Sequence, residues 1–414
     1  MFYGNEYPIE WNFFILNWEY SLCQMAESEK GIGMTPLAEA ARNKLMLGLF
    51  LPIQSGGWSP STTPRGTDWS FDYNAALTQR CEALGFDLVF GQAQWMGSQG
   101  YGGKTKYRSE TLDAFIVAAG LCALTKRIIV ISTLHILYGP LHPLHVAKFG
   151  ATVDHIGKGR WGLNVVTGFA PDEFTMFGME PIPHDQRYRI AAEFTEALET
   201  LWRSKSDVTL EGQGWKLKNA YAGPTPVNGR PIMVCAATSP AGLDYAGKHA
   251  DLVFITSPAG AEIEAALKAL PEHNATVKGF AAKYGRQVRT IINPLIICRE
   301  TEKEARAEYD RIVAGEDKEA VDRLFGRFQS ASADSWRGHA RDQRVVGGNI
   351  QIVGTPQQVA ERCVQLQKAG CDGIQICFFD FAPELEFFGE RVLPLLKQAG
   401  LRAPDVQTAQ RASA

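Results

Sequence analysis

Short apolar runs alternate with longer amphipathic stretches along most of the chain. The apolar runs are rich in β-branched and aromatic residues and are bounded by glycine or polar residues, which favours buried strands of a parallel sheet over helices. These predicted strands cover residues 45–51, 86–90, 128–134, 161–166, 232–236, 252–255, 290–298 and 373–377. The predicted helices cover residues 72–84, 112–124, 143–155, 187–203, 239–248, 302–313 and 384–398, with further helical sequence up to residue 284 and after residue 355.

This alternation predicts an α/β fold in which each of eight strands is followed by a helix. Such an arrangement is typical of a TIM (β/α)8 barrel with insertions. An open, doubly wound parallel sheet is the alternative that the same pattern allows. A hairpin is expected around residues 208–218, whereas residues 168–186 and the polar segment 316–346 are expected to be irregular.

The regular pattern divides the chain into three parts. Residues 45–400 form the predicted barrel domain, and residues 401–414 form a C-terminal tail. Residues 1–44 differ from the rest because aromatic side chains crowd this segment, so we interpret it as an N-terminal extension. It is either an arm that packs on a partner subunit or sequence upstream of the true start, and residues 1–40 are expected to be dispensable for folding.

Composition and charge narrow the classes of function. The chain has 414 residues, of which 45% are hydrophobic and 21% charged, and its 42 basic and 45 acidic residues leave a net charge of −3. No block of like charge occurs, so we expect neither a nucleic acid nor a membrane as partner, and a small uncharged or weakly anionic substrate fits better. The eight cysteines form no CxxC pair and the N-terminus lacks a secretory signal, so we expect a cytoplasmic protein with reduced thiols.

The strand at residues 161–166 contains one polar side chain, Asn164, and ends at Thr167 and Gly168. An amide inside an apolar strand must find a hydrogen-bond partner or lower stability. Ligands of parallel barrels and sheets lie at the carboxyl ends of the strands, which favours a functional role for Asn164. The alternative is an amide that only satisfies neighbouring backbone groups.

A second candidate site follows the strand at residues 232–236. Ser239 and Pro240 stand at the N-cap and first position of a predicted helix, where free backbone N–H groups suit a phosphate. Arg187 and Tyr188 begin another helix and could add a charge-assisted bond to the same group. An ordinary helix cap explains Ser239 equally well.

Four histidines raise the question of a metal site. His135, His142, His145 and His155 lie in one region of the sequence, but no acidic ligand stands at helical spacing to them. Substrate contacts or surface positions explain them better, and we predict no metal.

Four segments together resemble the bacterial luciferase-like flavin monooxygenases. The segments are residues 159–169, 184–188, 354–362 and 387–395. The resemblance extends from about Lys44 to Gln398, and the nearest branches are the dimethylsulfone and alkanesulfonate monooxygenases and pyrimidine oxygenase.

The resemblance implies a TIM barrel that uses reduced FMN, delivered by a separate NAD(P)H:flavin reductase, and molecular oxygen to oxygenate a small organic molecule. A sulfone, a sulfonate or a related compound with cleavage of a C–S or C–N bond is the expected substrate. The implied assembly is a homodimer or homotetramer. Alternatives are a pyrimidine-type ring-opening oxygenase, a deazaflavin-dependent oxidoreductase on the same barrel, and a flavin-binding subunit that has lost oxygenation.

The resemblance also implies roles for individual residues. Thr133 and Asn164 match the positions beside the oxygen and flavin N5 site of the pyrimidine oxygenase branch. The implied cofactor ligands are Ala93, Gln94, Asn164, Glu173, Arg187, Tyr188 and Ser239. Gln94 departs from the family, because relatives often carry Lys or Arg there, and this puts charge-based stabilisation of reduced flavin or of an anionic substrate in doubt. Phe169 stands where relatives often carry Trp, which alters the shape of the pocket.

Overall fold

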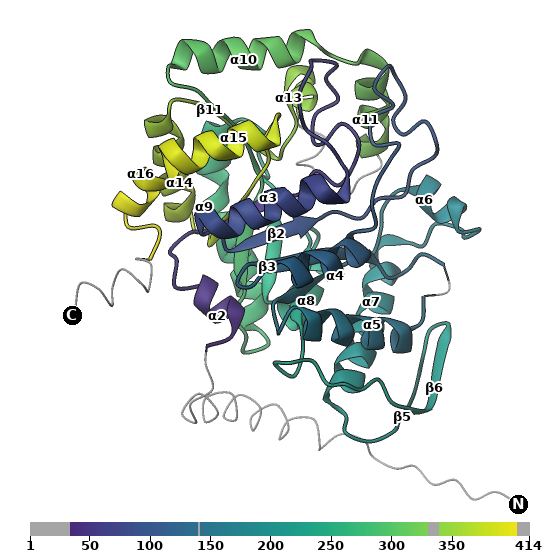
Figure 1. Ribbon diagram of the computed structural model, residues 1–414. Helices are drawn as coiled ribbons and strands as arrows, with labels where there is room; N and C mark the ends of the chain where they lie inside the picture. The colour runs from purple at the N-terminus through teal and green to yellow at the C-terminus, as the bar shows by residue number, and fades with distance from the viewer. Residues whose placement is uncertain (1–33, 140, 330–338, 404–414) are drawn as a thin grey trace, which may run out of the picture.

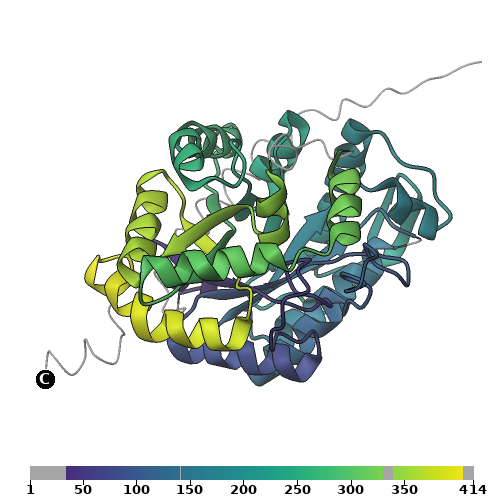
Figure 2. The same cartoon turned by 90° about the horizontal axis from the view of Figure 1, so that it is seen from above.

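Parallel strands form the centre of the molecule and helices surround them (Figure 1 and Figure 2). The computed structural model describes residues 34–139, 141–329 and 339–403. Within these ranges, eight parallel strands close into a barrel in the order β1-β12-β9-β8-β7-β4-β3-β2. Their bounds are Met46–Phe50 (β1), Leu88–Gly91 (β2), Ile129–His135 (β3), Trp161–Val166 (β4), Ile232–Ala236 (β7), Leu252–Ile255 (β8), Arg289–Ile292 (β9) and Gly373–Ile376 (β12). The closed barrel confirms the predicted TIM barrel and excludes the open sheet.

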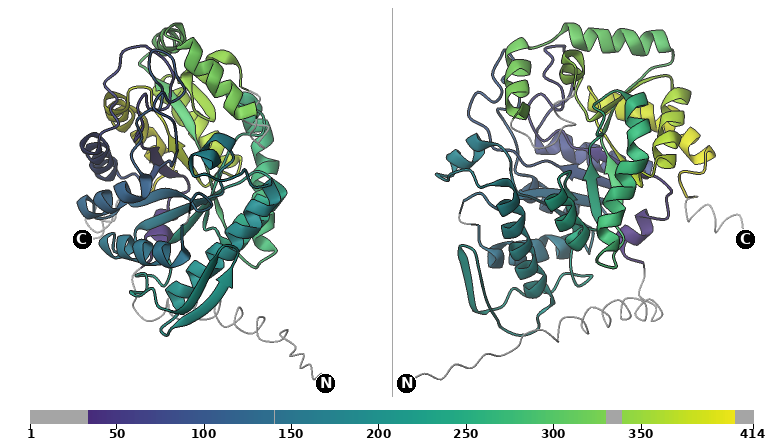
Figure 3. Two further views of the ribbon diagram at one scale, coloured as in Figure 1. Left: turned by 90° about the vertical axis from the view of Figure 1, so that its right-hand side faces the viewer. Right: turned by 180° about the vertical axis from the view of Figure 1, so that it is seen from behind.

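Helices cover the outside of the barrel, and the strands are therefore buried on both faces, which explains their continuous apolar sequence. The covering helices are α3 (Phe71–Leu84), α4 (Ala114–Leu124), α5 (Pro143–Ile156), α7 (His184–Arg203), α8 (Pro240–His249), α9 (Ile263–Ala282) and α14 (Pro356–Lys368). The predicted last helix consists of α15 (Phe381–Phe387), the π-helical turn η1 (Phe388–Val392) and α16 (Leu393–Gln398). The predicted hairpin is present as β5 (Val208–Gly212) and β6 (Trp215–Ala220), which project from the barrel (Figure 3).

The predicted strand 290–298 is wrong as a single element. It divides at Asn293 into β9, which belongs to the barrel, and β10 (Pro294–Cys298), which pairs in parallel with β11 (Ile350–Gly354) outside it. Pro294 has no N–H to donate to the barrel ladder, and the carbonyl of Asn293 instead accepts from the backbone N–H groups of Asn349 and Ile350. The second half of the apolar run therefore pairs with a strand of an insertion instead of with the barrel.

The two segments expected to be irregular also contain regular structure. Helix α6 (Pro171–Met176) lies between residues 168 and 186. After α10 (Glu302–Ala314), the insertion contains α11 (Lys318–Gln329), α13 (Arg341–Val346) and β11. Helices α11 and α13 have sequences rich in polar residues, and β11 pairs with β10 outside the barrel.

The described residues near both proposed domain boundaries pack on the barrel. Helix α2 (Pro36–Ala40) places Ala40 against the core, and Leu37 packs beside it. Arg402 is 8% exposed and forms an ion pair with Asp87 at the start of β2, at a distance of 2.5 Å. The remaining residues of the predicted extension and tail, 1–33 and 404–414, lie outside the described residues. The division at 44 and 400 stays a proposal, and a truncation that spares α2 is the appropriate test of it.

Other expectations concern helices, thiols and metals. No helix in the described residues is both long and apolar enough to cross a bilayer. Cysteines within residues 34–139, 141–329 and 339–403 are free and buried. The same residues contain no cluster of three or more His, Cys, Asp or Glu side chains suited to a metal ion.

Candidate functional site

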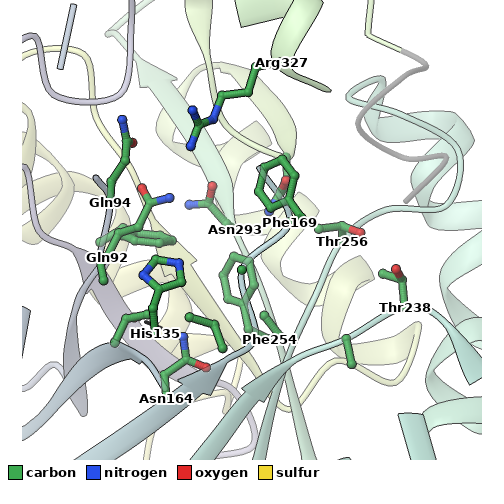
Figure 4. Close-up of a pocket in the computed structure, with 18 of the residues that line it drawn as sticks. Gln92, Gln94, His135, Asn164, Phe169, Thr238, Phe254, Thr256, Asn293 and Arg327 are labelled. Carbon is green, nitrogen blue, oxygen red and sulfur yellow. Dashed lines mark hydrogen bonds between the residues drawn. The ribbon is translucent and has the colours of Figure 1, made fainter. Parts of the chain in front are cut away.

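A cavity of about 300 Å³ opens at the carboxyl ends of the barrel strands (Figure 4). Strands run in one direction around a TIM barrel, so the side chains that follow them converge at this end. All residues that the sequence analysis proposed for the site line this cavity, namely Ala93, Gln94, Thr133, Asn164, Glu173, Arg187, Tyr188 and Ser239. The fold thus brings together residues from the ends of four strands, β2, β3, β4 and β7, and from helices α6 and α7, while their individual roles stay predictions.

Asn164 and Thr133 form a buried polar pair on adjacent strands. They are register partners in the parallel pairing of β3 with β4, and each is 3% exposed. The Asn164 Nδ2 donates to Thr133 Oγ1 at 3.0 Å, whereas the Asn164 Oδ1 has no hydrogen-bond partner among the described residues. The amide therefore bonds to a side chain rather than to backbone, and its orphaned acceptor is available to a ligand.

His135 lies two residues beyond Thr133 on β3 and faces the same cavity (Figure 4). Burial, with a smaller effect of the nearby Arg327 charge, lowers the pKa of His135 to about 3, so the imidazole is neutral at physiological pH. Its ring stacks on Tyr138 with 4.6 Å between the ring centroids. The centre of the cavity thus presents neutral hydrogen-bonding groups: an amide, a hydroxyl and an imidazole.

Glu173 on α6 is the acceptor of a buried network. Its Oε2 accepts from the Tyr138 hydroxyl at 2.6 Å, its Oε1 accepts from the backbone N–H of Trp95 at 3.3 Å, and it forms an ion pair with Arg327 of α11. Arg327 also contacts Asp172 at 2.7 Å. Burial raises the pKa of Glu173 while Arg327 opposes that shift. Both oxygens of Glu173 are engaged, so these contacts hold α11 against α6, and its cofactor contact stays a prediction.

One side of the cavity is suited to an anion. Ser239 is the N-cap of α8, and its Oγ accepts from the Gly242 N–H at 3.2 Å. The Tyr188 hydroxyl lies against the same helical turn. A Cβ added to Gly242 would come within 2.7 Å of it. Arg187 is 7% exposed and donates to the carbonyl of Gly168, and its Nε has no acceptor within the part of the chain that the structure describes. A buried guanidinium beside a helix N-terminus is suited to binding an anion.

The other side carries a charge that the sequence analysis missed. Gln94 stands where a basic residue is frequent, but its Oε1 accepts from Arg108 Nη1 at 2.9 Å. The Arg108 guanidinium also lies over the rings of Trp58 and Tyr107, at 4.8 Å and 5.0 Å from their centroids. Arg108, on the loop before α4, therefore places a positive charge beside Gln94, where relatives often carry a basic residue.

The sequence analysis did not propose three further lining residues, Asn293, Arg327 and Arg344, and it explained His135 only as a substrate contact or a surface position. His135 carried a detectable signal, because side chains two apart in a strand share a face and Thr133 was already placed at the site. The others lie at the β9/β10 break or in the insertion, and no local pattern marks them.

Residues 46–373 match the family model described as luciferase-like monooxygenase. The chain belongs to this family. It is 32% identical over 370 residues to the FMNH(2)-dependent dimethylsulfone monooxygenase of Pseudomonas fluorescens (strain Pf0-1), which covers 87% of this chain and 97% of the relative. It is also 32% identical over 361 residues to the pyrimidine monooxygenase RutA of Acinetobacter baylyi, covering 85% of this chain and 95% of the relative.

Solved structures agree on the fold. The crystal structure of the long-chain alkane monooxygenase LadA superposes on this chain with a TM-score of 0.75 at 21% identity, covering 87% of this chain and 93% of that one. At this identity the likeness supports the luciferase-like barrel alone.

Proposed function

We propose that this protein is the oxygenating component of a two-component monooxygenase. It takes reduced FMN from a separate NAD(P)H:flavin reductase and uses molecular oxygen to oxygenate a small organic molecule, with cleavage of a C–S or C–N bond. The observation that carries the proposal is the cavity itself, which combines an anion site at Arg187 and α8 with a neutral, buried centre at Thr133 and Asn164. Relatives named as FMNH(2)-dependent support the choice of cofactor.

The residues present fit FMN. Arg187 is a buried cation whose Nε lacks an acceptor, and with Ser239 and Tyr188 at the first turn of α8 it would hold the phosphate. The orphaned Oδ1 of Asn164 would accept a hydrogen bond from the flavin ring, and the Thr133 hydroxyl would lie beside it. Reduced FMN, when bound, supplies the electrons that activate oxygen.

The residues of this chain would orient the reacting groups and exclude water from the cavity. Three aromatic side chains, Phe50, Phe90 and Phe254, line the cavity and pack against one another with ring centroids 5.1 to 5.9 Å apart. Excluding water would favour transfer of oxygen to the substrate over release of hydrogen peroxide, and a preorganised donor such as Asn164 Nδ2 would help to orient the reacting group. The neutral state of His135 adds no competing charge at this centre.

The direct test is a reconstitution. In anaerobic titrations, reduced FMN should bind the purified protein while a deazaflavin should bind much more weakly. Mixing the loaded enzyme with ¹⁸O₂ and a panel of sulfones, sulfonates and pyrimidines should then incorporate one labelled oxygen atom into product. Preferential binding of the deazaflavin, or oxygen consumption without labelled product across the panel, would contradict the proposal.

We further propose that the protein forms a homo-oligomer through α4 and α5. These neighbouring helices expose apolar side chains to solvent, with Ile116 71% and Phe149 53% exposed and Leu124 and Ile156 also exposed. Helix α4 contains no charged residue along its length. Exposed apolar patches of this kind mark protein interfaces. The free, buried cysteines of the described residues support placement in the cytoplasm.

Ile116→Asp should shift the assembly toward monomers, because it places a charge at the centre of this apolar face. Light scattering after size-exclusion chromatography measures the mass of the assembly. Met34→Asp is the matched control, since Met34 is 56% exposed and precedes α2, outside α4 and α5. An unchanged mass for Ile116→Asp, or a monomeric wild type, would rule out this interface.

A further inference from the structure

We propose that the substrate carries an anionic oxygen group, a sulfonate or a carboxylate, on an apolar body, and that Arg108 binds this group. The proposal rests on the proposed function and narrows its substrate class. It excludes neutral sulfones and pyrimidines as the preferred substrates, although monooxygenases named for such compounds are among the relatives.

Arg108 is a buried cation that has no counterion among the described residues. Its side chain lines the cavity at 7% exposure and donates to the side-chain oxygens of Gln94 at 2.9 Å and Gln92 at 3.4 Å, and the hydroxyl of Tyr107 is a further neutral hydrogen-bond partner. No carboxylate of the described residues lies within 4.0 Å of it. A buried charge that is met only by neutral groups lowers stability, and an anionic ligand would compensate it.

Two buried hydrogen-bond donors, one on Arg108 and one on its partner Gln94, have no acceptor among the described residues. Arginine can only donate, so the oxygen of Gln94 must face Arg108 and its NH₂ group must point elsewhere. Both Gln94 Nε2 and Arg108 Nε are buried without an acceptor in the described part of the chain. Two orphaned donors beside one uncompensated charge call for a ligand group that only accepts hydrogen bonds, which is the property of a sulfonate or a carboxylate.

A second positive charge reinforces this side of the cavity. Arg344 on α13 lines the same cavity, and burial lowers its pKa to about 10, so the side chain stays charged at neutral pH. The phenol of Tyr107 lies close enough to interact electrostatically with both Arg108 and Arg344. Arg327, which also lines the cavity, forms ion pairs with Glu173 and Asp172.

The anion site at Arg108 is separate from the one at α8. Figure 4 places Gln94, the partner of Arg108, and Thr238, which precedes the N-cap of α8, on opposite sides of the cavity, with His135, Asn164 and Phe254 between them. The phosphate of FMN therefore does not account for Arg108. Aromatic side chains fill the space near Arg108, because Trp58 lies under its guanidinium and contacts Phe50 at 3.9 Å between ring centroids. These walls suit an apolar substrate body.

The test uses the full chain loaded with reduced FMN under anaerobic conditions. Calorimetric titration compares three probes of similar size: 1-hexanesulfonate, heptanoate and neutral dipropyl sulfone. At least one anion should bind tenfold or more tightly than the neutral sulfone, and the two anions separate the sulfonate from the carboxylate form of the proposal. This comparison needs only the wild-type protein. Equal or tighter binding of dipropyl sulfone would overturn the proposal.

Variants then assign the effect to Arg108. Arg108→Met should weaken anion binding roughly tenfold to a hundredfold, the loss expected for a charge-assisted bond, and leave the affinity for dipropyl sulfone unchanged. Arg108→Lys should retain part of the anion affinity, and thermal melting reports whether either variant is folded. Arg187→Met is the reciprocal control, since it should weaken FMN binding and not the affinity of folded, FMN-saturated enzyme for the anion.

Two results would contradict the assignment. Unchanged anion affinity in folded Arg108→Met would place the anion elsewhere, and a selective loss of reduced FMN affinity in that variant would mean that Arg108 serves the flavin. Failure of reduced FMN to bind the wild type is a distinct outcome, because it contradicts the proposed function before any substrate probe is added.

Discussion

Replacing Asn164 with alanine is expected to leave reduced FMN binding largely intact and to divert oxygen consumption from product to hydrogen peroxide. The Asn164 amide is buried, donates to Thr133 Oγ1 and keeps its Oδ1 without a partner in the described residues, so it is a preorganised group at the centre of the cavity. Loss of one such group costs on the order of 10²–10³ in rate in other enzymes. The measurement is product formed per oxygen consumed, together with the peroxide released.

Thr133→Val should cause the same uncoupling, because it removes a hydroxyl at nearly constant shape. Ser132→Ala is the matched control on the same strand. Ser132 is fully buried and its Oγ accepts from the indole N–H of Trp161 at 2.9 Å, away from the cavity. Its loss should lower stability by an amount ordinary for a buried hydrogen bond, about 1 kcal/mol, and leave coupling unchanged. Wild-type coupling in both Asn164→Ala and Thr133→Val would move the oxygen site away from this pair.

The double variant Arg187→Ala/Ser239→Ala should lose most of its affinity for FMN. Hydrogen bonds to a charged group contribute about 1.5–3 kcal/mol each, so the dissociation constant should rise by roughly 10²–10⁴. Arg187 has no carboxylate partner in the described residues, so removing its charge breaks no ion pair there. Quenching of flavin fluorescence on titration measures the affinity.

Ser239 also caps α8, and its loss alone should lower the free energy of unfolding by about 1 kcal/mol. Thr355→Ala controls for this effect, because Thr355 is the N-cap of α14, has a capping box with Gln358 and does not line the cavity. The control should show a similar drop in thermal stability with unchanged FMN affinity. If the folded double variant binds FMN as tightly as the wild type, the phosphate lies elsewhere.

Local pattern determined most of the barrel. Each buried strand appeared as an apolar run. The start of a helix such as α14 was predictable from a Thr-Pro N-terminus with a Gln three residues after the cap. Both signals depend on neighbours in the chain, because a strand buried on two faces is apolar throughout and a cap bonds within its own first turn. For the same reason, residues 290–298 were wrongly predicted as one strand. Strands β9 and β10 are both buried, so their sequences have the same apolar character.

Part of the site was also accessible from the sequence. Asn164 was visible as a polar residue in an apolar strand, and Ser239 as a cap directly after another strand. Position at a strand end is enough to predict such residues, because every strand of a parallel barrel delivers its carboxyl end to the same face. The resemblance added Ala93, Gln94 and Glu173, and these also line the cavity.

Only the tertiary structure decided where the charges lie. The sequence suggested that Gln94 left its position neutral, but Arg108 folds back from the same long loop to bond with it. Arg327 and Arg344 both come from the insertion. Arg327 pairs with Glu173, which lies 154 residues earlier in the chain, and Arg344 lines the same cavity. Electrostatic pairing depends on distance and burial in space, and neither quantity is encoded in the spacing of residues along the chain.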